Sequence, residues 1–275
     1  MKKVRRPYKV KRKNTIFKNR VFWESLLLFL AISFLFYFLF FSQTFQLNEI
    51  YIFGNKEIKV QNVQVFLKEE IKKTFPSIFT VNILLVNSKK LEKKVLKKFP
   101  EIDTVKIYKK FPNVLDVQIK EREAVALFCK EELICGFLDK KGIIFKNSSA
   151  KYKKLPIMES SIHKLPLIIS LIHKEEIVLG EIAIKKEILK EILKIRENLE
   201  KKLKLNLEEY VLVKENKLNV KTSQNWKIYF NLERALDVQF LKLNSILEKE
   251  ISLKNREKLE YIDLTLTKVY YKYRD

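Results

Sequence analysis

Glycine is scarce in this chain of 275 residues, which has only Gly54, Gly136, Gly142 and Gly180. Their spacing forms neither G-x-G-x-x-G nor G-x-x-x-x-G-K-[ST], so the sequence excludes the Gly-rich phosphate loops of nucleotide-dependent enzymes. Histidine is scarcer still. His163 and His173 stand ten residues apart, and no ligand residue is spaced to join them in a metal site. We therefore expect no cofactor and no metal.

The sequence also lacks a recognisable catalytic nucleophile. Ser160 and Ser161 lie near His163, but no G-x-S-x-G elbow surrounds them to serve a nucleophile. Glu121 and Glu123 have strand spacing, yet the intervening Arg122 favours a solvated or ion-paired strand end over a catalytic carboxylate pair. The sequence therefore predicts a protein that is not an enzyme and has no small-molecule substrate. A membrane-anchored envelope hydrolase is the enzymatic alternative, and it lacks its active-site residues here.

Acidic residues are few compared with basic ones. There are 33 Asp and Glu against 56 Lys and Arg, which gives a net charge of +23. Such a balance suggests binding to nucleic acid or to an anionic membrane surface. With 47% hydrophobic residues, the chain can still bury a core, and its length allows one or two modest domains.

One long apolar run near the N-terminus decides between these partners. Residues 25–41 carry no charge, and a helix over 21–41 would be about 31 Å long, enough to span a bilayer. Residues 1–20 hold ten basic and no acidic groups, so we expect the N-terminus in the cytoplasm and residues 42–275 outside. No small-residue cleavage site follows the run, so we expect a retained anchor. The basic tail is then explained by topology, and we expect no nucleic-acid partner.

The next residues predict the order strand, helix, helix, strand, strand. The strands are expected at 45–53, 102–108 and 114–120. Apolar residues at helical spacing predict the two helices, which end before Pro76 and Pro100, and Asn87 or Ser88 is the expected N-cap of the second. Phe99 and Val117 are the expected core contacts. The helical faces are Val63, Phe66, Leu67 and Ile71, then Leu91, Val95, Leu96 and Phe99.

Four runs in this part resemble a known family. They read FQLNEIYIFGN at 45–55, NILLVN at 82–87, KLEKKVLKKFPEIDTV at 90–105 and FPNVLDVQIKERE at 111–123. In order, spacing and position after the apolar run, they are similar to the POTRA domain of the bacterial cell division protein FtsQ, called DivIB in Gram-positive species. The resemblance implies a cytoplasmic tail at 1–20, a transmembrane helix at 21–41, a POTRA-like domain at 45–122 and an FtsQ-type β-domain at 123–275.

The resemblance continues to the end of the chain. Asp139-Lys140-Lys141-Gly142 is similar to the family's D-x-x-G-x-x-F, and Ile262-Asp263-Leu264 to its closing I-D-L-R. Three departures are Ala124, Thr265 and Asn231, where relatives have Pro, Arg and Gly. We expect an α+β fold: a single transmembrane helix, a β-α-α-β-β POTRA-like domain, and a mixed β-domain with two helices. The expected strands are 124–129, 133–138, 165–168, 210–214, 217–222, 226–231 and 259–264, and the helices are 188–203 and 235–247.

Cys129 and Cys135 are the two cysteines of the chain, and both fall outside the membrane, where disulfides persist. A three-residue loop at 131–133 would make them direct cross-strand partners within disulfide reach, whereas a two-residue loop would offset them. Two buried free thiols remain the alternative.

The resemblance implies a non-enzymatic divisome scaffold at the septum of the bacterial inner membrane. Its partners would be FtsB- and FtsL-like single-pass proteins, and it would restrain septal peptidoglycan synthesis until assembly is complete. A POTRA-bearing transport or chaperone adaptor is the alternative. We expect the partner site on the last strand and the tail after it, because a terminal strand is by position a sheet edge and tyrosine suits binding hot spots. The expected residues are Tyr261, Leu264, Leu266, Val269, Tyr270 and Tyr271.

Overall fold

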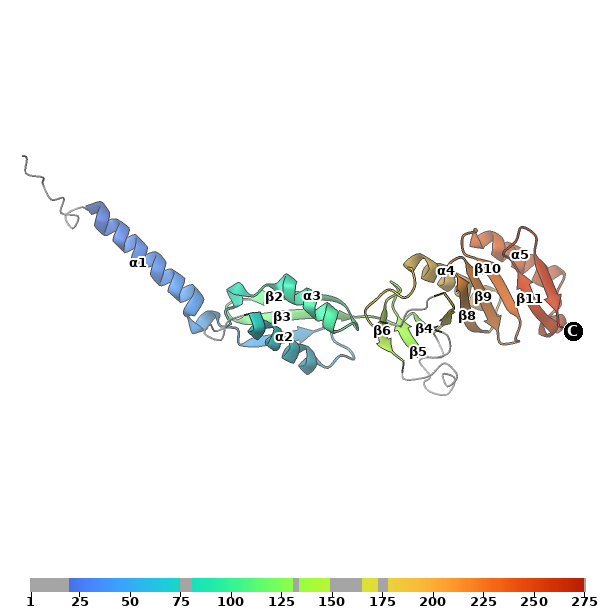
Figure 1. The fold of residues 1–275 in the computed structure, drawn as a ribbon, viewed down its shortest axis with the longest axis horizontal. Coiled ribbons are helices and arrows are strands. Elements are labelled where there is room, and N and C mark those ends of the chain that lie inside the picture. The colour runs from blue at the N-terminus through green and yellow to red at the C-terminus, as the bar shows by residue number, and fades with distance from the viewer. Residues whose placement is uncertain (1–19, 75–80, 131–133, 149–164, 173–177, 275) are drawn as a thin grey trace, which may run out of the picture.

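The computed structural model describes residues 20–74, 81–130, 134–148, 165–172 and 178–274. The basic residues before Arg20 therefore lie outside the described residues, as do Ser160, Ser161, His163 and His173. Figure 1 shows an elongated molecule in which a long helix is followed by two domains in line. We call residues 45–122 the first domain and residues 123–275 the second domain.

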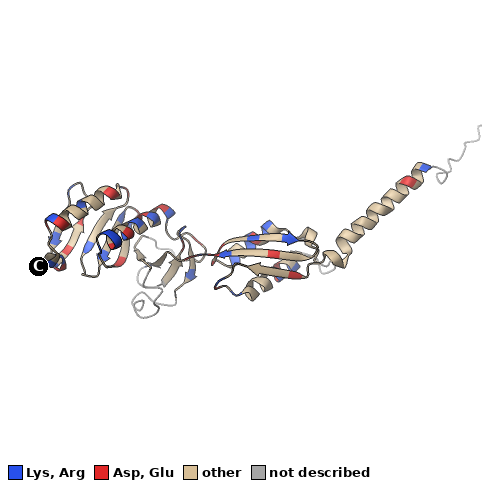
Figure 2. Ribbon diagram, turned by 180° about the vertical axis from the view of Figure 1, so that it is seen from behind, with Lys and Arg blue, Asp and Glu red and all other residues tan. Residues whose placement is uncertain are grey.

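The long helix, α1 (Arg20–Phe41), buries none of its residues against the protein. Its 22 residues give a length of about 33 Å. It is the one helix in the described part of the chain that is long and apolar enough to cross a membrane. Figure 2 shows charge only near its N-terminal end, where Arg20 pairs with Glu24 at 2.9 Å.

The first domain has the expected β-α-α-β-β order. Its sheet has the order β1-β3-β2, with β1 parallel and β2 antiparallel to the central β3. Gly54 ends β1 with φ +85°, and a Cβ there would approach the carbonyl oxygen of Ile119 to 2.3 Å, so glycine is required. The elements are β1 (Glu49–Phe53), α2 (Val60–Thr74), α3 (Ser88–Lys98), β2 (Ile102–Lys110) and β3 (Val114–Glu121).

Apolar faces of both helices cover one face of this sheet. The core includes Val63 and Leu67 of α2, Val95 of α3 and Val117 of β3, and each of these is fully buried. Asn87 is the N-cap of α3, because its side chain accepts the N–H of Lys90.

Three details of the first domain differ from expectation. Leu96 is exposed rather than inward-facing. Phe99 packs only partly against the core, with its ring edge-on to Phe66 at 5.5 Å. The first strand begins at Glu49 rather than Phe45, because Gln43–Phe45 form a 3₁₀ turn directly after α1.

The second domain is a nine-stranded sheet in the order β12-β11-β10-β9-β8-β7-β4-β5-β6. Most neighbours are antiparallel, while β4–β7, β7–β8 and β10–β11 are parallel. The strands are β4 (Ala126–Lys130), β5 (Ile134–Leu138), β6 (Ile144–Asn147), β7 (Leu167–Ser170), β8 (Leu207–Lys214), β9 (Lys217–Thr222), β10 (Lys227–Asn231), β11 (Leu259–Asp263) and β12 (Tyr270–Tyr273).

Two helices pack on one face of this sheet, α4 (Lys186–Glu197) and α5 (Leu236–Lys249). Their buried residues and the inward side chains of the strands form one core around Trp226 and Phe230, both fully buried. The expected helix 188–203 ends earlier, at Glu197, and continues as a π-helical turn over Asn198–Lys202.

The end of the chain differs most from expectation. The strand at 259–263 is not the last one, because β12 follows it and pairs with it antiparallel. The prediction that no strand covers β11 is therefore wrong. The five-residue run Val269–Tyr273, rich in tyrosine, has the composition of a strand and could have revealed β12.

Candidate partner-binding site

β12 forms one edge of the nine-stranded sheet, and β11 lies inside it between β10 and β12. In the register, Ile262 stands opposite Tyr271 and Asp263 opposite Tyr270. Paired residues share a face, so Tyr271 lies on the buried face of Ile262 and Tyr270 on the opposite, outer face. At this end of the sheet, the backbone edge that a further strand could pair with is therefore that of β12.

The structure divides the six expected partner residues into two groups. Leu264 is buried, Val269 packs partly against the core, and Tyr261 is half-buried on β11. These three therefore serve the fold of the second domain. Leu266, Tyr270 and Tyr271 have exposed fractions of 50%, 52% and 37% and are accessible to a partner.

A row of tyrosines on the outer face joins the expected Tyr261 and Tyr270 with Tyr229, which was not predicted. Tyr229 of β10 stands beside Asp263, which in turn stands beside Tyr270. The ring of Tyr261 stacks on that of Tyr229 at 5.3 Å. Burial raises the pKa of Tyr229, so its hydroxyl stays protonated and can donate. The alternation of β10 could have revealed this residue, since Ile228 and Phe230 face the core.

The turn between β11 and β12 is held by Asp263 and Thr265. A single carboxylate oxygen of Asp263 accepts the backbone N–H of Thr265 at 2.8 Å and its hydroxyl at 2.6 Å. Thr265, the departure from the family's Arg, therefore has a local role in the turn. Lys242 of α5 donates to the carbonyl oxygen of Thr267 at 2.6 Å and ties the same turn to the helix.

An exposed apolar face of α5 borders this turn. Val238 and Leu241 are 49% and 70% exposed. Val238 lies one helical turn before Lys242, and Leu241 directly precedes it. Lys242 is the residue that donates to Thr267. Leu266 in the turn is exposed as well.

Comparison with protein families identifies the first domain. Residues 47–122 match the model of the POTRA domain, FtsQ-type. The chain contains an FtsQ-type POTRA domain. The match confirms the resemblance to the FtsQ/DivIB family and supports a role in cell division. Comparison with curated proteins gave no match.

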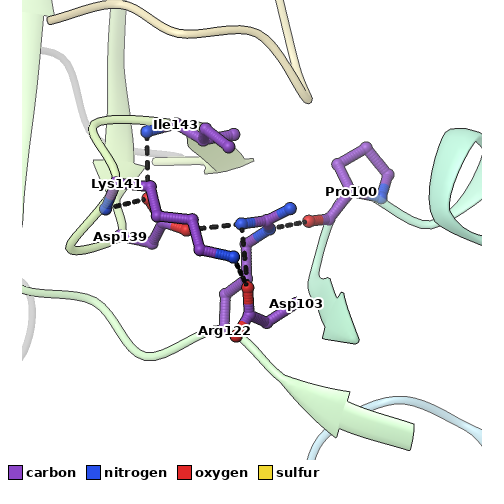
Figure 3. Close-up of polar contacts among 6 residues, drawn as sticks. All are labelled: Pro100, Asp103, Arg122, Asp139, Lys141 and Ile143. Carbon is purple, nitrogen blue, oxygen red and sulfur yellow. Dashed lines mark hydrogen bonds and ion pairs between the residues drawn. The ribbon is translucent and has the colours of Figure 1, made fainter. Parts of the chain in front are cut away.

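The POTRA domain joins the second domain through a partly buried ionic cluster, drawn in Figure 3. The guanidinium of Arg122 pairs with the carboxylate of Asp139 and donates to the carbonyl oxygen of Pro100 at 2.8 Å. Asp139 also accepts the backbone N–H groups of Lys141 and Ile143 at 2.8 and 3.0 Å. The D-x-x-G turn of the second domain is therefore held against the end of the POTRA sheet.

A second carboxylate completes this cluster. Asp103 accepts from Lys141 at 2.5 Å and lies 3.5 Å from Arg122. The hydrogen bond from Lys141 outweighs burial and lowers the pKa of Asp103. Since Asp103 and Lys141 come from different domains, their ion pair is a further tie across the joint.

Glu121 and Glu123 have separate structural roles beside this joint. Glu121 accepts the backbone N–H groups of Lys56, Glu57 and Ile58 at 2.5, 3.0 and 3.0 Å. Burial would raise the pKa of Glu121, but these donors lower it. Glu123 forms an exposed ion pair with Lys56 at 3.4 Å. Each of these two side chains therefore has its own structural partners.

The structure joins Cys129 and Cys135 by a disulfide. They are direct cross-strand partners, with Lys130 opposite Ile134 next to them. With Leu127 and Ile169 they form a small buried cluster apart from the main core. In the described ranges, no three His, Cys, Asp or Glu side chains gather as metal ligands.

Proposed function

We propose that this protein is a non-enzymatic, single-pass component of the bacterial division machinery. α1 anchors it in the cytoplasmic membrane with the N-terminus inside, and the POTRA domain and second domain lie outside at the septum. The FtsQ-type POTRA domain supports this proposal, as do the length and composition of α1. The same match favours division over the alternative of a transport or chaperone adaptor.

The observation that carries the proposal is the position of β12 at one edge of the nine-stranded sheet, where no described strand lies beyond it. An edge strand offers backbone donors and acceptors to an incoming strand, and neighbouring side chains decide which strand is accepted. Tyr270 and Tyr271 supply area with a polar tip, as binding hot spots require. We propose that a strand of an FtsB-like partner adds here.

The exposed face of α5 gives the site a second part. Leu241 and Leu266 would contact a helix or apolar segment of the partner on the side of the turn that Lys242 holds. Apolar side chains contribute roughly 25 cal/mol for each Å² that a partner covers. The complex, rather than any reaction at this protein, would then restrain septal peptidoglycan synthesis.

Partner capture by the full-length chain in detergent micelles tests the proposal. We expect the Leu266→Glu, Tyr270→Glu double variant to lose the FtsB/FtsL-like pair, because two charges would be buried in the interface. Leu171→Glu is the matched control, because Leu171 is 52% exposed and follows β7. It should bind as the unaltered chain does.

Folding is checked separately by thermal unfolding of each variant. Retained partner binding by the folded double variant contradicts the β12 site. Even envelope distribution of the tagged protein in dividing cells contradicts the division role itself.

A further inference from the structure

We propose that the tip of the POTRA domain next to α1 docks on the outer headgroup layer of the bilayer through Phe111 and Leu85, flanked by lysines. We call residues 81–90 and 109–113 the tip. This inference rests on the proposal that α1 spans the membrane, and it adds a second membrane contact. The bilayer surface is the committed partner, because the tip is held where α1 ends.

Asn82 is the residue that fixes the tip to α1. Its side chain is buried, and its amide nitrogen donates to the carbonyl oxygens of Leu39 and Phe40 at 2.7 and 3.2 Å. Those carbonyls belong to the last turn of α1, which has no helical donors left for them. The amide oxygen of Asn82 accepts the N–H of Leu84 at 2.8 Å. One side chain thus connects the helix end to the tip.

Other contacts close the same junction. The rings of Phe38 and Phe45 meet edge-on at 5.9 Å. Gln46 forms a β-bridge with Asn82, and the N–H of Leu47 donates to the carbonyl oxygen of Val81 at 2.8 Å. The junction therefore contains backbone pairing, aromatic packing and a polar cap. It holds the tip close to the level at which α1 leaves the hydrocarbon core.

The tip exposes apolar side chains at this level. Phe111 and Leu85 are 57% and 52% exposed, and Pro112 beside Phe111 is exposed too. The two segments of the tip are tied together, since Lys109 donates to the carbonyl oxygen of Leu84 at 2.8 Å. Aromatic and apolar side chains at the end of a membrane helix suit the interface between headgroups and hydrocarbon.

The charge of the tip suits anionic headgroups. Lys89, Lys90, Lys109 and Lys110 belong to it, and the sequence of these two segments contains no acidic residue. Lys110 lies 4.0 Å from Asp116, and its side chain is still 72% exposed. Lysines can reach headgroup phosphates while their stems cover apolar surface. Apolar insertion and lysine pairing would therefore act on the same surface.

A depth measurement on the full-length chain tests this docking. Since the two native cysteines form a disulfide, Phe111→Cys adds the single thiol for an environment-sensitive fluorophore. The labelled chain is reconstituted in vesicles of equal parts phosphatidylcholine and phosphatidylglycerol. We expect a blue shift of the emission and a loss of intensity with a headgroup-level quencher. An unshifted emission that this quencher leaves unchanged overturns the docking.

Two further labelled positions make the result unambiguous. Phe53→Cys is the matched control, because Phe53 is 52% exposed on the same domain but at the other end of β1. We expect it to stay unshifted, and equal quenching at both positions would overturn the specific role of the tip. Ser33→Cys lies within α1 and reports insertion. Suppose the label at Ser33→Cys is quenched from within the hydrocarbon core, while the label at Phe111→Cys is not quenched at headgroup level. This result rejects the docking and leaves the proposed anchor intact.

Substitution of Asn82 tests the junction itself. Asn82→Asp keeps the acceptor for Leu84 and removes the donor to Leu39 and Phe40, so we expect less quenching at Phe111. Asn87→Asp is the matched control, because Asn87 caps α3 without contacting α1 in the described residues. Equal quenching in both variants would overturn the role of Asn82.

Discussion

The edge strands of the two sheets differ in how their backbone groups and side chains are covered. In the POTRA domain, Gln64 of α2 donates to the carbonyl oxygen of Ile50 on β1 at 2.8 Å. On the opposite edge, Glu92 of α3 accepts the N–H of Ile107 on β2 at 2.8 Å. Each helix therefore occupies a backbone group of one edge strand. In the second domain, the edge strand β12 carries exposed Tyr270 and Tyr271.

This difference bears on where a partner strand can add. An edge whose donors or acceptors are already paired is a poor template, and native proteins often protect edges in such ways. The comparison supports β12 over the POTRA edges as the partner site.

The largest expected effect comes from removing Phe230, because the sheet behind β12 depends on its core. Phe230 is fully buried, with its ring 6.1 Å from that of Phe240. We expect Phe230→Ala to lower the free energy of unfolding by about 3–5 kcal/mol and to weaken partner binding. Hydrogen exchange should place the loss in the second domain.

Phe99→Ala is the counterpart in the POTRA domain. Since Phe99 is only partly buried, we expect a loss of about 1–2 kcal/mol and unchanged partner binding. Partner binding that falls more with Phe99→Ala than with Phe230→Ala would reverse the comparison.

Arg122→Ala tests whether the two domains are rigidly joined. Its loss leaves Asp139 with two backbone donors and no ionic partner within this cluster, at a cost of about 1.5–3 kcal/mol. We expect faster hydrogen exchange at both sides of the joint. Lys141→Ala is the milder control, since that side chain is 45% exposed. Identical exchange in the Arg122 variant and the unaltered chain would show that the cluster does not hold the joint.

Glu92→Ala frees a backbone N–H group on β2, one edge strand of the POTRA sheet. It leaves the N–H of Ile107 without its acceptor, and we expect a loss of about 1 kcal/mol in thermal unfolding. Glu92→Gln keeps an acceptor oxygen and should lose less. Partner binding is expected to stay unchanged, so an increase with Glu92→Ala would move the site to the POTRA edge.

The smallest expected effect is on acid stability. Glu121 has a lowered pKa in the folded protein against an ordinary value of 4.5. Its contribution to stability is complete above the ordinary pKa and is lost as the pH falls through the lowered one. Thermal unfolding between about pH 6 and about pH 3 should show a shallower acid decline for Glu121→Gln. Equal declines would contradict a role for the carboxylate charge.

Local sequence patterns predicted the helices and strands well, but they predicted poorly which strands pair with one another. Helical spacing identified α2, and alternation identified β3, because each pattern is set by burial within one element. The parallel pairing of β10 with β11 brings together residues over thirty positions apart, and no local pattern encodes it. β12 was missed for a different reason: its residues have a local strand composition, but the strand prediction ended at Leu264, before the turn held by Asp263 and Thr265.

Polar contacts were the least predictable part. The ion pair of Arg122 with Asp139 connects two domains. The hydrogen bond from Asn82 to Leu39 connects residues that are 43 positions apart. Both depend on how rigid elements meet, which composition and periodicity do not describe. Accessibility of the expected partner residues was predicted in part: Leu266 and Tyr270 are exposed, whereas Leu264 on the same short segment is buried.

The strand order of the second domain determines how far its last strands lie from the end of α1. β4 to β6 lie toward the POTRA domain and β11 toward the far end, as Figure 1 shows. Eight steps between nine strands cover about 38 Å, and β2 adds about 30 Å along the POTRA domain. A helix that rises from the membrane beside α1 needs roughly 45 residues to climb that far. If the partner site lies at β12, as proposed, a helical partner must be about that long to reach it.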